Sequence, residues 1–454
     1  MPHARRALSA LAAAALAAVL VVPTASATEP QGASAPAAAV PVANFPSAAK
    51  AWVGRSMSAL SSDCTYESTE VTTGGGAVDV LRVCLVPSGD SWKWSARLAT
   101  QLPGASRPTN VRTLTGPAGA EVPHLATAKN GSAALVVPTA SSTQVWRRAA
   151  KSTSWSKTDT LKGAPTSVAV GLSRQGTLTV ATAVGRSLTV RTAAAGAKLS
   201  APQTVATASP KGSVGREYEY TSLALSVDGS GAAVLAYAFH YVDWDWKERT
   251  TKAVVATRKA GASRFGTPTT FTTSALQQVS VVQAGAKSVV AWAGATGARA
   301  RVKPSATGQW TSATTLSKTY STVTLAGSGN GRVDVATTTF GGSLTTRSLG
   351  KGTASKFSAV RFTASRVVAS EVRIVHRGAG EPVLVYSVTS DRSNPTATQR
   401  QAVAGTSGTG WSSFTILASS SVAIPGAAAA GDGEGNAAIH LRPASQPSYL
   451  AVWR

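Results

Sequence analysis

The chain has 454 residues, of which 43% are apolar and 14% are charged, and its 44 lysines and arginines against 20 acidic residues give a formal net charge of +24. This is the composition of a folded, basic protein, and it excludes collagen, a coiled coil and a disordered low-complexity chain. Because the chain has only 2 cysteines, a disulfide scaffold and a four-cysteine zinc site are also excluded.

The N-terminus has the pattern of a secretory signal peptide. Arg5 and Arg6 precede an apolar run over 7–22, and small residues at 25–27 suit a cleavage site. The apolar run is about 16 residues long, which is shorter than the ~20 that a membrane-spanning helix needs. We therefore expect residues 1–27 to be removed on export and the mature protein to be secreted and extracellular.

Two short segments follow the signal peptide. Residues 28–49 are rich in alanine, proline and serine, a composition that predicts a flexible leader. Residues 50–76 are expected to hold the end of a short helix, predicted over 47–60, and one strand of a hairpin. Cys64 and Cys84 are equidistant from the middle of the glycine-rich turn of that hairpin, so they can face each other across antiparallel strands. Since exported proteins meet oxidising conditions, we predict a disulfide between them.

From residue 77 to the end the chain repeats with a period of about 50 residues. Tight glycine-containing turns recur, each between two short strands rich in Val, Ala, Leu and Thr. An aromatic residue or leucine accompanies each pair and precedes an apolar residue about six positions later. The turns contain Gly131, Gly176, Gly231, Gly285, Gly331, Gly380 and Gly435, and the aromatic or leucine positions are Trp94, Trp155, Leu199, Phe265, Trp310, Phe357 and Trp411.

The repeats predict an all-β fold, a seven-bladed β-propeller over 77–454. Blades are expected at 112–163, 164–217, 218–274, 275–319, 320–366 and 367–421. The last repeat, 422–454, has only three strands, so we predict that an N-terminal strand from the region 77–103 completes it and closes the ring. Closure of this kind leaves only short, protected strand edges. Alternatively, the hairpin between the two cysteines adds an outer strand.

With these repeats the chain resembles secreted bacterial β-propellers that have sialidase-type, Asp-box-like repeats, many of them lectin-like. The resemblance rests on the strand pattern and on segments before the final strands, such as 258–265 and 301–310. A complete Asp-box reads Ser-x-Asp-x-Gly-x-x-Trp, and no copy here keeps the aspartate. The resemblance implies a lectin-like propeller, and the general profile is similar to that of the propeller lectin subunits of umbrella toxin particles.

One stretch, 216–249, differs from the repeats by its many aromatic and acidic residues. In a propeller its two parts, 216–220 and 241–249, open on the same face, where ligands commonly bind. Aromatic rings can stack on the apolar face of a pyranose while carboxylates accept hydrogen bonds from its hydroxyls, so the stretch predicts a sugar site. The expected stacking residues are Tyr218, Tyr220, Tyr241, Trp244 and Trp246, the acceptors are Asp243, Asp245 and Glu248, and the cations for an acidic substituent are Arg216 and Arg249.

Other interpretations of this stretch stay open. It is alternatively a hairpin extension that packs on a neighbouring blade, or a loop for a protein partner. A glycosidase needs two suitably spaced carboxylates, but the acids here all come from one blade, so we assign no catalytic residue and treat a sialidase-like hydrolase as a minority hypothesis. No metal, calcium or nucleotide motif is present, and we expect no metal and no cofactor.

The positive charge is spread over the repeats and not gathered in runs. Arg147, Arg191, Arg258, Lys303 and Arg347 stand near the ends of third strands, which predicts a basic face opposite the aromatic one. Such a charge attracts polyanions non-specifically, and no recognised nucleic-acid fold points to specific nucleic-acid binding. Alternatively, the charge serves solubility and retention in the cell wall.

Taken together, these features predict a secreted, monomeric binding module for cell-surface or cell-wall carbohydrate. The alternatives are a protein-interaction scaffold in a secreted or toxin assembly and, third, a glycoside hydrolase.

Overall fold

A computed structural model describes most of the chain from residue 53 onward. The described residues are 53–57, 66–88, 91–105, 108–117, 121–185, 187–207, 217–242, 251–273, 276–365, 367, 372–376, 382–389, 399–407, 410–411, 415–420, 428–431, 437–441 and 448–453. The expected signal peptide and leader, 1–49, lie outside them. Within the described part, no helix is long and apolar enough to cross a membrane.

The described strands form eight antiparallel sheets, which we call blades 1 to 8 in chain order. Blade 1 consists of β2 (Tyr66–Gly74), β3 (Ala77–Ser88), β4 (Ser91–Gln101) and β5 (Thr109–Gly116). Blade 2 consists of β6 (His124–Thr127), β7 (Ala133–Pro138), β8 (Ser142–Arg148) and β9 (Trp155–Lys162). Blade 3 consists of β10 (Pro165–Leu172), β11 (Leu178–Val184), β12 (Ser187–Ala193) and β13 (Gln203–Thr207), and blade 4 of β14 (Glu217–Val227), β15 (Ala233–Val242), β16 (Thr251–Arg258) and β17 (Thr269–Thr273). Blade 5 consists of β18 (Leu276–Ala284), β19 (Lys287–Gly294), β20 (Gly297–Lys303) and β21 (Thr314–Ser317). Blade 6 consists of β22 (Ser321–Gly327), β23 (Val333–Thr339), β24 (Leu344–Leu349) and β25 (Phe362–Ala364). Blade 7 consists of β26 (Arg373–His376), β27 (Pro382–Thr389), β28 (Gln399–Ser407), β29 (Gly410–Trp411) and β30 (Thr415–Ser420), and blade 8 of β31 (Ala428–Gly431), β32 (Ala437–Leu441), β33 (Ser448–Trp453) and β1 (Val53–Met57).

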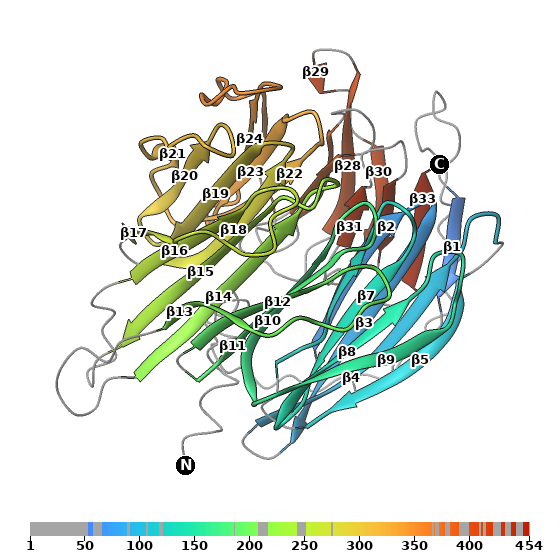
Figure 1. Cartoon of the computed structure of the whole chain (residues 1–454). Coiled ribbons are helices and arrows are strands. Elements are labelled where there is room, and N and C mark those ends of the chain that lie inside the picture. Colours follow the sequence, from blue (N-terminus) through green and yellow to red (C-terminus); the bar gives the residue numbers. More distant parts are fainter. Residues whose placement is uncertain are drawn as a thin grey trace.

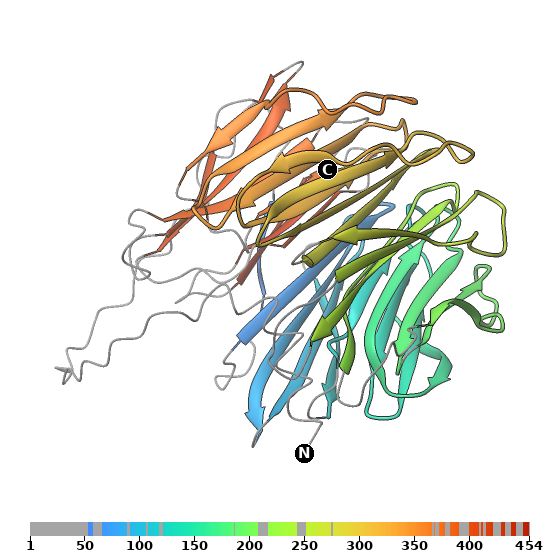
Figure 2. The ribbon, with the colours of Figure 1, turned by 90° about the vertical axis from the view of Figure 1, so that its left-hand side faces the viewer.

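The blades follow one another around a closed ring, so the fold is a β-propeller. The first strand of each blade contacts the first strand of the next, in the order β2, β6, β10, β14, β18, β22, β26, β31 and back to β2. Figures 1 and 2 show this sequence of sheets, with the blue β1 and β2 beside the red β31 and β33. The ring brings residues from distant repeats together at its two ends.

The expectation of seven blades is wrong, because residues 66–116 form a complete blade of their own. The predicted cysteine hairpin provides the two inner strands of blade 1, β2 and β3, and Trp94 lies in its third strand. The turn after Gly74 is therefore the turn of a repeat. It also packs tightly on blade 2, since a Cβ on Gly74 would lie 2.0 Å from the carbonyl oxygen of Ala128.

The last blade is completed by β1 and not by a strand from 77–103. β1 pairs antiparallel with β33, from Val53 opposite Val452 to Met57 opposite Ser448. Residues 53–57 are thus a strand, where the sequence predicted a helix over 47–60. The edge of β33 offers unpaired backbone N–H and C=O groups, which only an extended partner can satisfy. The propeller accordingly includes β1 and β2, which precede its expected start at residue 77.

Second strands lie between two neighbouring blades, which explains why β7, β11, β19 and β23 are buried along almost their whole length. In β15, Leu235 and Tyr237 pack with the apolar residues of blade 3, while Val234 and Ala236 pack with those of blade 5. The recurring motif aromatic also lies between blades, as Phe265 does at the contact of blades 3 and 4. Truncation of a fully buried leucine such as Leu235 to alanine typically costs about 2–5 kcal/mol.

The predicted disulfide remains a prediction. Cys84 is fully buried in β3, and no free cysteine occurs among the described residues. Its expected partner, Cys64, lies outside those residues.

Candidate functional site

The two ends of the propeller differ in the connections that they carry. Each first strand runs to the same end of the ring, where a tight turn such as 128–132, 173–177 or 228–232 leads to the second strand. We call this the turn end. The opposite end carries the connections between second and third strands, and we call it the loop end.

The predicted sugar site belongs to the loop end of blade 4. The backbone of the three tyrosines lies in a hairpin, with Tyr218 opposite Tyr241 and Tyr220 opposite Phe239 in the β14–β15 register. The remaining predicted residues lie outside the described part of the chain: Arg216, Asp243, Trp244, Asp245, Trp246, Glu248 and Arg249. The sugar site therefore stays a prediction.

The loop end also has an aromatic pair, in blade 6, that the sequence analysis missed. Tyr320 precedes β22 and Phe340 follows β23, and their rings meet edge to face with centroids 5.5 Å apart. The backbone N–H of Phe340 donates to the carbonyl of Tyr320 over 2.9 Å. Phe340 is 62% exposed, the largest exposed fraction among the bulky hydrophobic residues that the structure describes. In the sequence it is a single aromatic before Gly341-Gly342, which gives no repeat signal.

At the turn end, a central cavity of about 750 Å³ opens at the mouth of the ring. It is lined by the ends of the first strands and the turns of blades 1 to 6 and by Gly431 of blade 8. Its side chains are mostly polar, with hydroxyl groups from several blades. Its charged lining residues are Lys129, Arg174, Arg258, Lys259, Lys303 and Asp228.

The one carboxylate among these lining residues is engaged by its own turn. Asp228 Oδ1 accepts hydrogen bonds from the backbone N–H groups of Ser230 and Ala232 and from the Ser230 hydroxyl, over 2.6–3.0 Å. Burial raises the pKa of Asp228, and these hydrogen bonds work against that shift. Gly231 has φ +85°, a conformation that glycine adopts without strain. The Asp228 carboxylate thus stabilises the tight turn 228–232.

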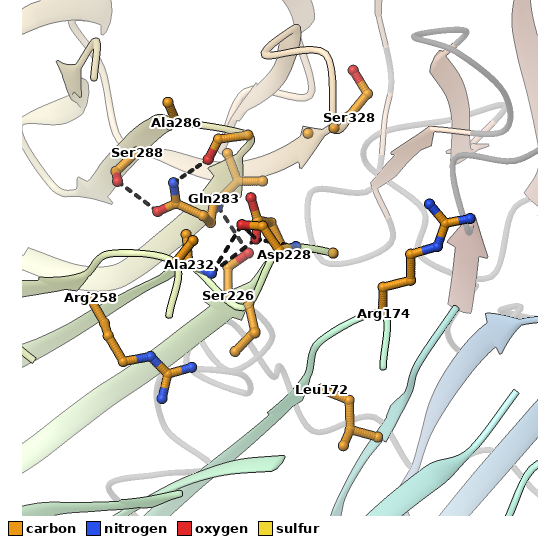
Figure 3. A pocket seen from close by; sticks show the side chains of 18 of the residues that line it. Leu172, Arg174, Ser226, Asp228, Ala232, Arg258, Gln283, Ala286, Ser288 and Ser328 are labelled. Carbon is orange, nitrogen blue, oxygen red and sulfur yellow. Dashed lines mark hydrogen bonds between the residues drawn. The ribbon is translucent and has the colours of Figure 1, made fainter. Parts of the chain in front are cut away.

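Arg258 links two blades beneath the pocket. Its side chain is buried, and Nη2 donates to the Thr179 hydroxyl of blade 3 over 3.0 Å and to the Gly231 carbonyl over 2.9 Å. Burial lowers the pKa of Arg258, and the charge of Asp228 opposes this effect. In Figure 3, Arg258 and Arg174 lie on opposite sides of the turn that carries Asp228.

Two lysines, Lys259 and Lys303, line the pocket on the side of blades 4 and 5. Lys303 Nζ donates to the Thr257 hydroxyl of blade 4 over 3.1 Å. Burial, together with the positive charge of Lys259, lowers the pKa of the Lys303 ammonium. Both lysines thus bring positive charge to the same side of the pocket.

The other cations approach from blades 2 and 3. A Cβ placed on Gly229 would lie 3.6 Å from Cβ of Arg174 and 3.9 Å from Cδ of Lys129, so both side chains pass beside the blade 4 turn. Lys129 and Arg174 each stand two residues before the turn glycine of their blade, where blades 4 and 6 have Gly229 and Gly329. A cation at this position in two neighbouring repeats is the local signal that could have pointed to the pocket.

The basic residues predicted to form one face of the propeller divide into two groups. Arg191 and Arg347 donate to carbonyls of their own blades, at Ser200 over 3.0 Å and Ser358 over 3.3 Å. Arg147 lies 3.7 Å from Asp159 of the same blade. Only Arg258 and Lys303 line the central pocket. The predicted basic face is thus not uniform, because hydrogen bonds hold Arg191 and Arg347 on carbonyl oxygens of their own blades.

No family model matches the chain, and no curated protein matches it. Several solved structures are similar to it in architecture. A Dos1 propeller has 10% identity and a TM-score of 0.48, with 86% of this chain and 95% of that chain covered. A fucose-specific lectin from Aleuria aurantia has 12% identity and a TM-score of 0.33, with 65% and 95% covered.

A prolyl endopeptidase structure has 12% identity and a TM-score of 0.45, with 84% of this chain covered. The present chain spans about half, 55%, of that endopeptidase chain. At such identities the likeness concerns architecture alone.

Proposed function

We propose that this propeller is a secreted carbohydrate-binding module that recognises cell-surface or cell-wall glycans with the loop end of blade 4. The observation that carries the proposal is the length of the hairpin bearing the predicted aromatic residues. β14 has 11 residues, whereas its counterpart β10 in blade 3 has 8. At ~3.3 Å per residue, the three additional residues extend the hairpin by roughly 10 Å. We assign ligand contact to this extended end of the hairpin, where Glu217 lies opposite Val242.

The chemistry assigned to this surface is binding without a catalytic step. Tyr218, Tyr241 and the two tryptophans would stack on sugar rings, and the neighbouring carboxylates would accept hydroxyl hydrogen bonds. An arginine of the same stretch would form charge-assisted hydrogen bonds with any acidic substituent.

A glycan array with the mature protein tests the proposal. Binding is measured at low and high salt, because salt screens simple charge attraction to this basic chain. We expect salt-resistant binding to defined sugars, weakened at least ~10-fold in the Trp244→Ala/Trp246→Ala variant through loss of stacking. Phe340→Ala, on blade 6, is the matched control. Binding that disappears with salt and is unchanged in the tryptophan variant would refute the proposal.

The exposed Phe340–Tyr320 pair favours a second candidate function, a protein-interaction scaffold in an extracellular assembly. Exposed aromatic residues are enriched at the centres of protein interfaces. If this function holds, Phe340→Ala should remove a co-purifying partner while the tryptophan variant retains it. Retention of all partners by Phe340→Ala would exclude this surface.

Export is part of the proposal and has its own test. Protein collected from the culture medium should begin at or near residue 28, which N-terminal sequencing measures. The intact mass should also be two hydrogens below that of the reduced chain, if Cys64 and Cys84 are joined. An intact N-terminus on cell-retained protein would contradict export.

A further inference from the structure

The connections between third and fourth strands of blades 2, 3 and 4 begin with the same tight turn at the turn end. In each turn a backbone N–H donates to the carbonyl three residues earlier, over 3.1–3.3 Å: Ser152 to Ala149, Ala197 to Ala194 and Ala262 to Lys259. The third residue of each turn has a positive φ, which is +73° at Gly196 and +74° at Gly261. In blade 2 this position is occupied by Lys151, with φ +59°.

Lys151 is the one non-glycine residue with a positive φ in the described part of the chain. A residue with a Cβ adopts this conformation at a cost in free energy, and it persists where the surrounding structure holds it. Here the buried Arg148 holds the turn, since its Nη1 donates to the carbonyls of Ala149 and Ser152 over 3.2 and 3.0 Å. The Lys151 side chain is exposed and has no hydrogen bond or ion pair with the described residues. Such strain without a structural return points to a function outside the chain.

Lys151 belongs to a series of exposed cations on these outer connections, which we call the basic rim: Lys151, Lys198, Lys259 and Arg264. None of the four forms an ion pair with any residue that the structure describes. The connections that carry them are fully described and contain no acidic residue: 149–154, 194–202 and 259–268. The acid of the neighbouring blade 4 turn, Asp228, is hydrogen-bonded within that turn. The basic rim is therefore a row of positive charges without counter-charges of its own.

Hydrogen bonds between blades hold the parts of the basic rim in place. Arg147 Nη1 of blade 2 donates to the carbonyl of Ala194, in the blade 3 connection, over 3.4 Å. The side-chain amide of Gln203, in blade 3, donates to the carbonyl of Phe265 and accepts from its N–H, over 2.8 Å each. The cations thus stand on a fixed row across three blades. A ligand that meets all of them must be extended and must carry negative groups along its length.

The same connections offer little to a lipid surface. Their bulky apolar residues are turned inward, because Phe265 is buried between blades and Leu199 packs on the core of blades 2 and 3. Proteins that lie on a bilayer insert apolar side chains into it in addition to the attraction of their cations. Three of the four cations are lysines, whose compact ammonium groups suit phosphate oxygens. A linear phosphate polymer is therefore the favoured partner.

We infer that the basic rim binds a linear polymer whose backbone carries phosphodiester groups. The inference is independent of the proposed carbohydrate surface, which lies at the opposite end of the ring. It also differs from general attraction between a basic protein and polyanions, because it assigns the contact to four side chains on three blades.

Titration calorimetry of the mature protein with poly(glycerol phosphate), at about 100 mM salt, tests the inference. We expect binding that Lys151→Gln/Lys198→Gln weakens at least ~5-fold through loss of two charged contacts. Lys151→Arg/Lys198→Arg, which keeps the charges, should bind within about twofold of the parent. The matched control is Lys162→Gln/Lys318→Gln, which removes two exposed lysines at the loop end and should also bind within about twofold.

Lys151→Gly separates binding from stability. Glycine adopts a positive φ without strain, so this variant should not lower the thermal unfolding midpoint. It should nevertheless weaken binding of the polymer at least ~2-fold, because one cation is lost. Polymer binding by Lys151→Gly equal to that of the parent would overturn the role of the strained lysine.

The inference as a whole fails if the polymer does not bind, or if the rim variant and the loop-end control are weakened equally, which would indicate overall charge alone. Vesicles that contain phosphatidylglycerol present the same phosphodiester group on a flat surface. Tighter rim-dependent binding to these vesicles than to the polymer would overturn the choice of a linear partner. Trp244→Ala/Trp246→Ala should bind poly(glycerol phosphate) like the parent, so failure of the carbohydrate proposal leaves this test unaffected.

Discussion

At Asp79 four donors converge on one buried carboxylate and join blade 1 to blade 2. Arg148 of blade 2 donates from Nη2 and Nε over 2.7 and 3.1 Å, and the hydroxyls of Thr100 and Thr127 donate over 2.7 Å each. The side chains of the ion pair are 0% exposed. Loss of one partner leaves the other as an unpaired buried charge, which is more damaging than loss of both.

We predict that Asp79→Ala lowers the free energy of unfolding by about 3–5 kcal/mol, as measured by urea denaturation. Replacement of both charged residues, in Asp79→Leu/Arg148→Met, should cost less than the single change because no charge is left unpaired. A single variant as stable as the parent would contradict this account of the blade 1–blade 2 contact.

His124, at the start of β6, provides a pH-dependent contribution. Burial acts to lower its pKa, but the charges and hydrogen bonds of Glu70 and Glu121 outweigh burial and raise the pKa to about 10. Because the folded pKa lies above the ordinary histidine value of 6.5, the stabilising contribution is complete below pH 6.5 and is lost as pH rises toward 10.

We therefore expect the His124 ring signals to show no titration between about pH 5 and 8 by NMR. Glu70→Gln should move the transition to lower pH, since it removes one of the stabilising charges. A transition near the ordinary histidine value in the parent protein would show that the two glutamates do not hold the proton.

At the scale of elements, β1 determines whether blade 8 has a protected edge. It is the outer strand on β33, and without it the edge of β33 would expose unpaired backbone groups. Deletion of residues 28–57 from the mature chain should lower the thermal unfolding midpoint and promote self-association. Deletion of 28–49 alone is the control and should change neither, because it leaves β1 intact. Thermal unfolding and size-exclusion chromatography measure both effects, and identical behaviour of the two deletions would contradict a closing role for β1.

The elements also show which features of the fold a local pattern can predict. The expected blade starts at 164, 218, 275 and 320 agree closely with the first strands that begin at Pro165, Glu217, Leu276 and Ser321, because the turn glycine and the buried second strand recur there. Blade 1 was missed because its glycine turn lies between two cysteines and resembled a separate hairpin. Strand β1 was missed because its partner, β33, lies at the other end of the sequence. The pocket was missed for a related reason, since it exists only where turns from many repeats meet.

At the scale of the whole molecule, the ring holds a chain with a formal net charge of +24. Like charges that are held close together in a compact fold repel one another, which lowers the free energy of unfolding. Salt screens this repulsion between exposed charges.

Raising sodium chloride from about 10 to about 150 mM should therefore raise the thermal unfolding midpoint, because the repulsion between exposed charges is screened. The buried ion pair of Asp79 and Arg148 is screened much less, so its contribution should be retained. Differential scanning calorimetry at the two concentrations measures the shift. A midpoint that stays constant or falls would show that self-repulsion does not limit the stability of the ring.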